Sequence, residues 1–344
     1  MRHGTAYPLG VLAVIVMVLL LPERTLGQTA TPDEAKAKTE GSVVYYTSSR
    51  TTTAEKHAKG FEKKYGIKVQ IFRSGTEKVM AKLEAEIQAG RIQADVVSVS
   101  DPGYYLALQA RGALLPYVSR YAGTIPAPFK DQDGQWNSNR VINMVMAYNT
   151  KFISADQAPR RWTDLTDPKW QGKITVASPS YGGTSLNWVA GMLKLYGWKF
   201  FEDLGKNKPL MTEGHQPGMQ LVASGERLLS GEMNDYDARA SVVRGQSVAI
   251  VMPQEGVVAI PSPMAIMKAT VRPNAAKLFV DYLLSEEGQV IMVEDEYYYS
   301  PRTDVAPPKG AIPLGDLKVI PMDWQAVERQ SEEIKTRFSS ILGK

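Results

Sequence analysis

Cysteine is absent from all 344 residues of the sequence, and histidine occurs only three times. A chain without cysteine forms no disulfide and offers neither a thiol nucleophile nor a cysteine for lipid attachment. The sequence also contains no G-x-S-x-G, H-E-x-x-H or G-x-x-x-x-G-K pattern. These absences speak against an enzyme, although spacing alone leaves a Ser-His-Asp arrangement through His215 open, so an exported hydrolase stays as a remote alternative.

Long apolar runs are also missing, except for one near the N-terminus. This run extends from about residue 9 to 21, follows Arg2, and precedes the small residues Thr25 and Gly27. It is short for a membrane span, so we predict a cleaved signal peptide over residues 1–27 and a soluble periplasmic protein. An uncleaved N-terminal anchor is the alternative.

Charge of either sign is nearly balanced, with 40 basic and 36 acidic residues. Removal of residues 1–27 takes Arg2, Glu23 and Arg24 away and leaves a net charge of +3. The basic residues are scattered through the sequence rather than clustered. Nucleic-acid binding therefore gains no support.

Segments of strand and helix character alternate after a polar stretch at residues 28–41, which we expect to be a flexible leader or at most a frayed helix. Short runs rich in Val, Ile and Tyr end in clusters of Ser, Thr or Gly, and amphipathic segments follow them. This order favours parallel β-α-β units in a doubly wound sheet. The predicted strands are 43–46, 67–72 and 94–100, and the predicted helices are 53–66 and 76–90.

The same alternation continues from residue 148 to 251, and a long amphipathic helix is expected to begin near Pro273. Doubly wound sheets bind ligands beyond the carboxyl ends of their strands, where this chain places hydroxyl residues at 47–53 and the sequence SDPGYY at 100–105. Hydroxyl residues between a strand and a helix either cap the helix or help to hold an anionic group at its open N–H groups.

Ten stretches across residues 42–305 carry a family resemblance through their order, and no single one decides it. They are VVYYTSS, FEKKYGIKV, KLEAEIQAGRIQADVV, GALLPY, VMAYNTK, WTDLTDPKWQGKITVASPSYGGTS, VASGE, MPQEG, AIMKATVRPNAAKLFVDYLLSEEGQ and SPRTDV. In this order the sequence resembles the type II periplasmic binding proteins of ABC importers. The branch it resembles contains binders of ferric iron, thiamine, phosphonates and sugar phosphates.

The resemblance implies an α/β fold of two lobes, each a doubly wound sheet, joined by two crossover hinge strands. It implies that residues 42–147 and 256–310 form the first lobe, that 148–255 form the second, and that 311–344 pack helically on both. It further implies a monomer without a cofactor, which delivers a small molecule to a membrane permease and its ATPase. Closure of the lobes on the ligand would create the form that the permease recognises.

Ferric-iron binders of this branch hold the metal with a His, a Glu and two adjacent Tyr, because Fe(III) prefers anionic oxygen ligands. Where those proteins have the histidine, this sequence has Ser49; where they have the acid, it has Ser100, followed by Asp101. The tyrosine pair falls on Tyr236 and Asp237, so only one phenol remains. No metal site is favoured, and Asp101, Tyr236 and Asp237 are the ligand set if iron is bound.

Replacement of His and Glu by two serines turns a metal-binding corner into one suited to hydroxyl donors. Across the cleft, the turn SPSYGGTS lets backbone amides approach an oxyanion without obstruction by Cβ atoms. Two facing helix starts suit a phosphate, phosphonate or carboxylate. The predicted ligand-binding residues are Ser48, Ser49, Ser100, Asp101, Ser180, Gly182, Gly183, Thr184, Tyr236, Asp237 and Glu255.

We therefore predict a small anionic, oxygen-rich solute, with a phosphorylated or phosphonate compound favoured. Acidic residues at the rim, including Asp235, would accept hydrogen bonds from sugar hydroxyls or an amine. Arg50 and Arg302 either pair with the phosphate or form salt bridges of the protein itself. Ferric iron, thiamine and a polyamine are the alternative ligands. The three tyrosines at 297–299 are interpreted as packing residues.

Overall fold

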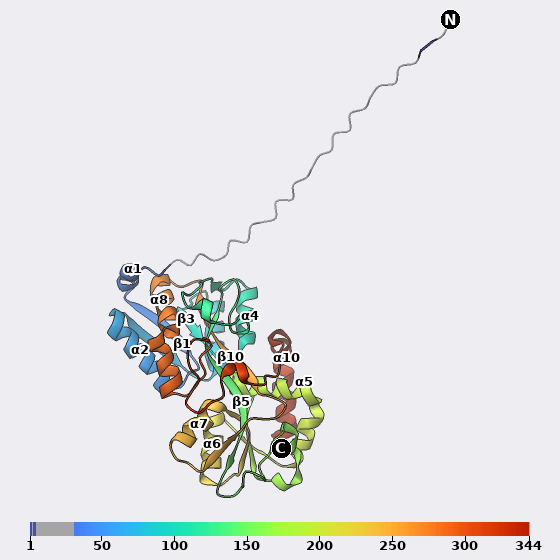
Figure 1. The fold of residues 1–344 in the computed structure, drawn as a ribbon. Helices are drawn as coiled ribbons and strands as arrows, with labels where there is room; N and C mark the ends of the chain where they lie inside the picture. The colour runs from blue at the N-terminus through green and yellow to red at the C-terminus, as the bar shows by residue number, and fades with distance from the viewer. Residues whose placement is uncertain (2, 5–30, 344) are drawn as a thin grey trace.

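Figure 1 shows the computed structural model, which describes residues 1, 3–4 and 31–343, as two lobes joined by long strands. The signal peptide predicted over residues 1–27 lies almost wholly outside the described residues. The strands are β1 (Ser42–Thr47), β2 (Lys68–Arg73), β3 (Val96–Ser98), β4 (Leu114–Leu115), β5 (Asn137–Asn149), β6 (Ile174–Ala177), β7 (Leu210–Thr212), β8 (Leu229–Asn234), β9 (Val248–Val251) and β10 (Val258–Met267). The α-helices are α1 (Glu34–Glu40), α2 (Thr51–Tyr65), α3 (Thr76–Gln88), α4 (Pro102–Ala110), α5 (Gly183–Lys206), α6 (His215–Ser224), α7 (Asp235–Val243), α8 (Pro273–Leu284), α9 (Glu286–Val290) and α10 (Trp324–Leu342).

The strands pair in the order β2-β1-β3-β10-β5-β8-β6-β7, which is parallel towards both ends and antiparallel in the middle. At one end β1 pairs with β2 and β3, and at the other β6 pairs with β7 and β8. The α/β alternation seen in the sequence produces these two parallel halves, since each helix returns the chain for another parallel strand. The doubly wound prediction is therefore confirmed for each lobe.

Two long strands, β5 and β10, run side by side through the middle of the molecule (Figure 1). Every residue of both strands is buried, and β10 is almost wholly apolar, whereas β5 begins with the polar run Asn137–Arg140. Pro263 is tolerated in this central position because the pairing of β10 with β5 shifts register between Ser262 and Pro263. These two strands are the connection between the lobes.

Helices cover each half of the sheet and form separate apolar cores. In the upper lobe of Figure 1, α2 and α8 pack through Phe61 and Phe279, whose ring centroids lie 5.0 Å apart. In the lower lobe, α10 lies along α5, with Phe338 5.4 Å from Phe201. Helix α10 also contacts α4 of the upper lobe, and its Lys335 donates to Glu77 of α3 at 3.0 Å. The C-terminal helix therefore contacts both lobes.

The expectation of a flexible leader is wrong for residues 34–40, which form α1. Asp33 caps this helix by accepting from the amide of Lys36, and the buried Ala37 packs against the core of the upper lobe. Glu40 accepts from the backbone amide of Ala275 at 2.7 Å, at the start of α8. Propensity did not reveal this helix because an isolated seven-residue helix is unstable. Its stability comes from docking.

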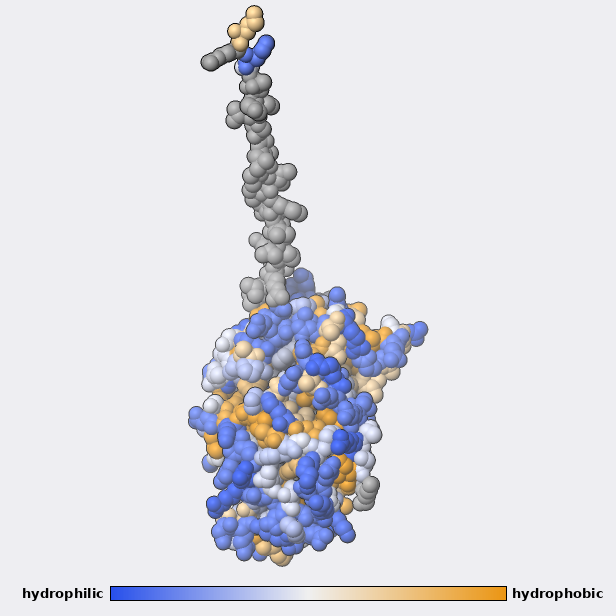
Figure 2. Space-filling model, turned by 90° about the vertical axis from the view of Figure 1, so that its right-hand side faces the viewer, coloured by the Kyte–Doolittle hydropathy of each residue, from blue (hydrophilic) through white to orange (hydrophobic). Residues whose placement is uncertain are grey.

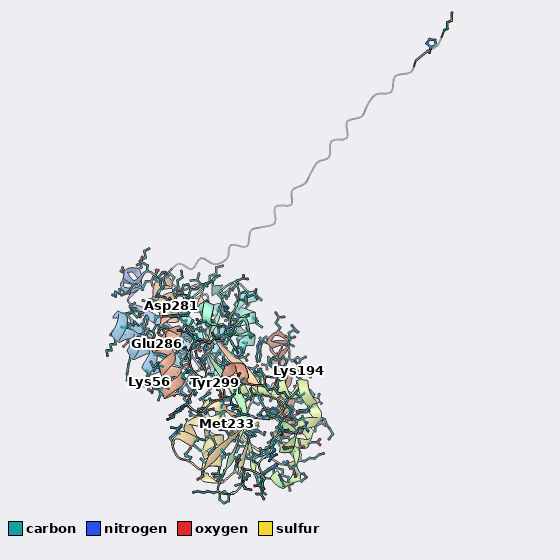
Figure 3. All side chains as sticks on the ribbon, viewed as in Figure 1. Lys56, Lys194, Met233, Asp281, Glu286 and Tyr299 are labelled. Carbon is teal, nitrogen blue, oxygen red and sulfur yellow. The ribbon has the colours of Figure 1, made fainter. Side chains whose placement is uncertain are left out.

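The single long helix expected from Pro273 is divided at Ser285 into α8 and α9. Ser285 has an extended backbone and its hydroxyl accepts from the amide of Gly288. Gly288 lies so close to α8 that an added Cβ would come within 2.3 Å of the Tyr282 carbonyl oxygen. The break turns the chain towards the junction between the lobes, where Tyr299 is labelled in Figure 3.

The surface is mainly hydrophilic on the face shown in Figure 2, with hydrophobic residues gathered near mid-height, between the lobes. Tyr299 is buried near this level, where its carbonyl oxygen accepts from the amide of Val141 of β5 at 2.8 Å and its hydroxyl donates to the Ile312 carbonyl at 2.8 Å. Within the described part of the chain, no helix is both long enough and apolar enough to span a bilayer.

Candidate functional site

A cavity of about 370 Å³ lies between the two lobes. Seven of the predicted residues line it, namely Ser48, Ser100, Gly182, Gly183, Thr184, Tyr236 and Asp237. They come from both lobes and sit where strands end and helices begin, as expected for a doubly wound sheet. The cavity is large enough for a small organic solute.

The first turns of five helices face this cavity. In one lobe, Arg50 precedes α2 and Gly75 precedes α3. In the other lobe, α5 begins at Gly183, α6 begins at His215, and Tyr236 is the second residue of α7. Each helix start carries unpaired N–H groups and the positive end of a helix dipole. The combined field favours negative charge in the cavity.

Four predicted residues lie outside the cavity lining: Ser49, Asp101, Ser180 and Glu255. Ser180 is exposed beside the cleft, whereas Glu255 accepts from the Tyr196 hydroxyl at 2.6 Å and from the Trp162 amide. Asp101 caps α4 by accepting from the Gly103 amide at 3.0 Å, and burial raises the pKa of its carboxyl to about 8. The side chains of Glu255 and Asp101 are thus engaged in hydrogen bonds within the protein.

Arg140 of β5 lines the cavity and was not predicted from the sequence. Ser49 lies behind the cavity and contacts Arg140. Arg140 is only 1% exposed, and its guanidinium donates to Ser49 Oγ at 2.7 Å and to Ser100 Oγ at 2.9 Å. Its Nε has no hydrogen-bond partner. In residues 31–343, no carboxylate forms an ion pair with it. Arg140 thus places an uncompensated buried positive charge on the cavity wall.

Two further arginines line the cavity. Arg73 donates from Nε to the Ser49 carbonyl at 2.9 Å, and no carboxylate of the described chain pairs with it. Arg50 differs, because it forms ion pairs with Asp237 and, at 3.2 Å, with Glu296. The acidic residues of the lining are Asp237 and Glu213, so arginine is in excess.

A buried histidine and glutamate lie at the opposite side of the cavity. His215 Nε2 is 2.5 Å from Glu232 Oε2 and 3.4 Å from the hydroxyl of Ser185. Burial opposes the charged imidazole, but the carboxylate of Glu232 outweighs it and raises the pKa of His215. Serine and glutamate approach the same ring nitrogen, whereas a Ser-His-acid relay needs one at each nitrogen. This cluster does not have the geometry of a nucleophilic triad.

The proposed iron ligands are not gathered around one point. Tyr236 stacks on Tyr298 with ring centroids 4.0 Å apart, and its hydroxyl accepts from Asn234 Nδ2 at 3.0 Å. Burial, together with the charge of Asp237, raises the pKa of Tyr236 well above its usual range, so the phenol stays protonated. Asp101 lies outside the cavity lining. Among the described residues, no three His, Cys, Asp or Glu side chains form a metal-binding group.

The lobes touch across the cavity. A Cβ added at Gly183 would lie 2.7 Å from the carbonyl oxygen of Ser100 in the other lobe, and one at Gly75 would lie 3.2 Å from the Tyr181 carbonyl oxygen. The ion pair between Arg50 and Asp237 also crosses from one lobe to the other. The structure therefore represents a closed cleft.

A closed cleft between two α/β lobes joined by two long strands defines the class of two-lobed solute-binding proteins. The chain belongs to the bacterial extracellular solute-binding proteins, whose sequence profile matches residues 92–325. Proteins of this class act as the periplasmic binding components of ABC importers, and this confirms the family and the function implied by the sequence resemblance.

Three similar proteins illustrate the relationship. An uncharacterized protein of Haemophilus influenzae is 30% identical over 267 residues, which cover 74% of this chain and 75% of its own. A probable ABC transporter periplasmic-binding protein of Sinorhizobium fredii is 25% identical over 289 residues, with 76% of each chain covered. The periplasmic binding protein AfuA of Actinobacillus pleuropneumoniae, solved with fructose-6-phosphate, has a TM-score of 0.79 and 26% identity over 88% of this chain and 99% of its own.

Proposed function

We propose that the protein captures a small organic anion that carries a phosphate or phosphonate group and delivers it to the permease and ATPase of an ABC importer. The anionic group would bind where Arg140, Ser48, Ser100 and the start of α5 converge. The rest of the solute would contact the polar side chains of the second lobe, among them Asn234 and Asp237.

One observation carries this proposal, the buried guanidinium of Arg140 with no carboxylate partner in the part of the chain that the structure describes. Burial of a charge without a partner costs free energy, and an anionic ligand recovers it. A guanidinium donates two parallel hydrogen bonds to a phosphate or carboxylate. The arginine excess and the five helix starts add to this preference.

The same charges oppose the alternative ligands. A polyamine or thiamine is cationic and would meet Arg73 and Arg140 in the cavity wall. Ferric iron needs anionic oxygens, whereas the one carboxylate of the iron set that lines the cavity, Asp237, is already paired with Arg50. Relatives that bind a sugar phosphate, such as AfuA, support the phosphorylated class.

Binding in the cleft favours the closed form because the solute contacts both lobes only there. The permease would then recognise the closed form as loaded. We expect the protein to act as a monomer, since the cleft is complete within one chain. The solute would leave chemically unchanged, because the Ser185, His215 and Glu232 cluster lacks a relay geometry.

A ligand panel tests the proposal on the mature protein. Sugar phosphates, aminoalkylphosphonates, thiamine forms, polyamines and ferric citrate are compared by thermal shift and calorimetry. A true ligand at a hundredfold excess over Kd stabilises by about 2.7 kcal/mol. We expect this response from a phosphate or phosphonate ester, and phosphorus NMR should recover that compound intact. A response to ferric citrate or to a polyamine alone would contradict the proposal.

Arg140→Gln is the decisive variant, and Arg239→Gln is its matched control. Arg239 is also a buried arginine, but it lies outside the cavity lining. Loss of a buried charged partner costs about 2–5 kcal/mol of binding free energy, and each 1.4 kcal/mol is about tenfold in Kd. Arg140→Gln should weaken binding accordingly, while Arg239→Gln should keep the affinity of the wild type.

The periplasmic location rests on the sequence of residues 1–27 and on the location of its relatives. We propose that this segment is a signal peptide that is removed on export. Mass spectrometry of the protein released from the periplasm would give the new N-terminus. A mature protein that still contained residues 9–21 and stayed with the membrane would favour the N-terminal anchor.

A further inference from the structure

Arg50 lies at the start of α2, on the upper lobe, and its guanidinium is held by three residues from two separate parts of the chain. It forms ion pairs with Asp237 of α7 and with Glu296, and its Cζ lies 4.6 Å from the ring centroid of Tyr236. The side chain of Arg50 is 14% exposed, and those of Asp237 and Glu296 are 5% and 6% exposed. The guanidinium thus occupies the centre of a nearly buried group.

The partners of Arg50 would form an anionic oxygen cluster without it. The amide nitrogen of Asn234 bridges the Tyr236 hydroxyl, at 3.0 Å, and the second oxygen of Asp237, at 3.1 Å, so phenol and carboxylate lie side by side. Glu296 supplies a second carboxylate. Two carboxylates and a phenol are hard oxygen donors of the kind that trivalent cations prefer.

One other cation approaches this cluster from outside. Lys56 Nζ is 3.6 Å from Glu296 and 3.2 Å from Asp295, and its side chain is 45% exposed at the lower edge of the upper lobe (Figure 3). Lys56 therefore screens Glu296 only from the solvent side. On the cavity side, the charge of the two carboxylates is balanced by Arg50.

We propose that Arg50 is a specificity-determining residue that acts as a resident cation and keeps metal ions out of the cleft. A metal ion would have to displace a guanidinium that is tethered to the protein and already paired with two carboxylates. Because Arg50 belongs to one lobe and Asp237 to the other, it also bridges the closed cleft in the manner of a bound cation. This inference deepens the proposed function and rests on the same cleft being the binding site.

Terbium(III), a trivalent oxygen-seeking probe, tests the inference through emission sensitised by nearby tyrosine. Wild type, Arg50→Ala and Arg50→Gln are titrated with terbium in buffer without phosphate. Separate samples of the same three proteins are titrated with ferric citrate. Both variants should gain one saturable site, at least about tenfold tighter than any wild-type site, which is about 1.4 kcal/mol. Arg50→Gln keeps hydrogen-bond donors, so the test stands even if Arg50→Ala fails to fold.

Two controls locate the new site. Arg73→Ala removes another arginine of the cavity wall, one without a carboxylate partner, and should gain no site. Adding Asp237→Asn to Arg50→Gln should abolish the gained site. Tight terbium binding by the wild type, equal gain in Arg73→Ala, or no gain in either Arg50 variant would each overturn the inference.

The anion panel on the wild type separates this inference from the proposed function. If no phosphate or phosphonate compound binds but the Arg50 variants gain terbium, the ligand class is wrong and the role of Arg50 stands. If a phosphorylated compound binds and the Arg50 variants gain nothing, the ligand class stands and the resident-cation role is wrong.

Discussion

Arg140 and Arg50 face the same cleft, yet their surroundings are opposite. Arg140 is the more deeply buried and has only hydroxyl and amide oxygens as partners, Ser49, Ser100 and Asn139. Arg50 is slightly more exposed and has two carboxylates. The charge of Arg140 remains available to a ligand, whereas the charge of Arg50 is neutralised by carboxylates of the protein.

The number of charged side chains in a cleft therefore does not by itself define the ligand. The ion pairs of Arg50 stabilise the closed form without ligand. The unpaired charge of Arg140 destabilises that form and gains an anionic partner only when the ligand binds. Differential stabilisation of this kind is what allows a ligand to shift the population towards closure. Four measurements test this contrast between Arg140 and Arg50.

The largest effect is expected on the stability of the unliganded protein. Arg50→Gln leaves Asp237 and Glu296 as nearly buried carboxylates without their guanidinium partner, which costs about 3 kcal/mol. Arg140→Gln removes a charge that has no counterion and should cost clearly less, although Arg140 is more buried. Urea unfolding of both variants measures the difference. A larger loss in Arg140→Gln would break the comparison.

Closure comes next, because the two arginines share one cavity only when the lobes meet. Gly183→Ala places a methyl group within 2.7 Å of the Ser100 carbonyl oxygen, and overpacking of this kind costs about 1–3 kcal/mol of closing free energy. Ligand affinity should fall, and small-angle scattering should report a larger radius of gyration for the liganded protein.

Gly182→Ala is the matched control for closure, since a Cβ at Gly182 meets no atom within 4 Å. Because Gly182 lines the cavity, this control is measured by scattering, and its liganded form should keep the dimensions of the wild type. Equal behaviour of the two alanine variants would show that contact at Gly183 does not limit closure.

A smaller effect separates the two serines that hold Arg140. Ser100 lines the cavity and can also contact the ligand, whereas Ser49 lies behind the guanidinium. Ser100→Ala should weaken binding by about 0.5–1.5 kcal/mol, the value of one hydrogen bond. Ser49→Ala should change affinity less. The reverse order in calorimetry would mean that orientation of Arg140 matters more than direct contact.

The smallest effect concerns His215, a third cationic group with a single carboxylate partner. Its pKa is raised in the folded protein, because Glu232 outweighs the opposing effect of burial. The stability from this pair is therefore fully present below the unfolded pKa of about 6.5 and is lost as pH rises through the folded value. Urea midpoints of the wild type should fall over that range, and those of His215→Gln should not. Parallel pH profiles would contradict the assignment.

Local rules predicted the parts of the site that depend on one strand and the helix after it. Gly182, Gly183 and Thr184 follow β6, and Tyr236 and Asp237 follow β8, so the strand-end rule located them. Ser49 and Ser180 lie one position from Ser48 and Tyr181, which line the cavity, because neighbouring residues at such a junction point to different sides. Sequence spacing does not fix that direction.

The remaining parts of the site depend on tertiary pairing. Arg140 closes the polar run Asn137–Arg140 at the start of β5, and a polar run of this kind indicates neither its burial nor the face that it occupies. His215 and Glu232 are 17 positions apart and meet only because α6 packs beside β8. An arginine within a buried strand is expensive, and that cost is the signal that could have marked Arg140 as functional.

The position of Arg140 on β5 has a consequence for the order of events in transport. Strand β5 pairs with β10 and with β8 and so belongs to the connection between the lobes, and we expect this guanidinium to move little when they part. The charged end of a solute can therefore bind to Arg140 while the cleft is still open. The other lobe then closes over a solute whose charged end is already bound at the connection between the lobes.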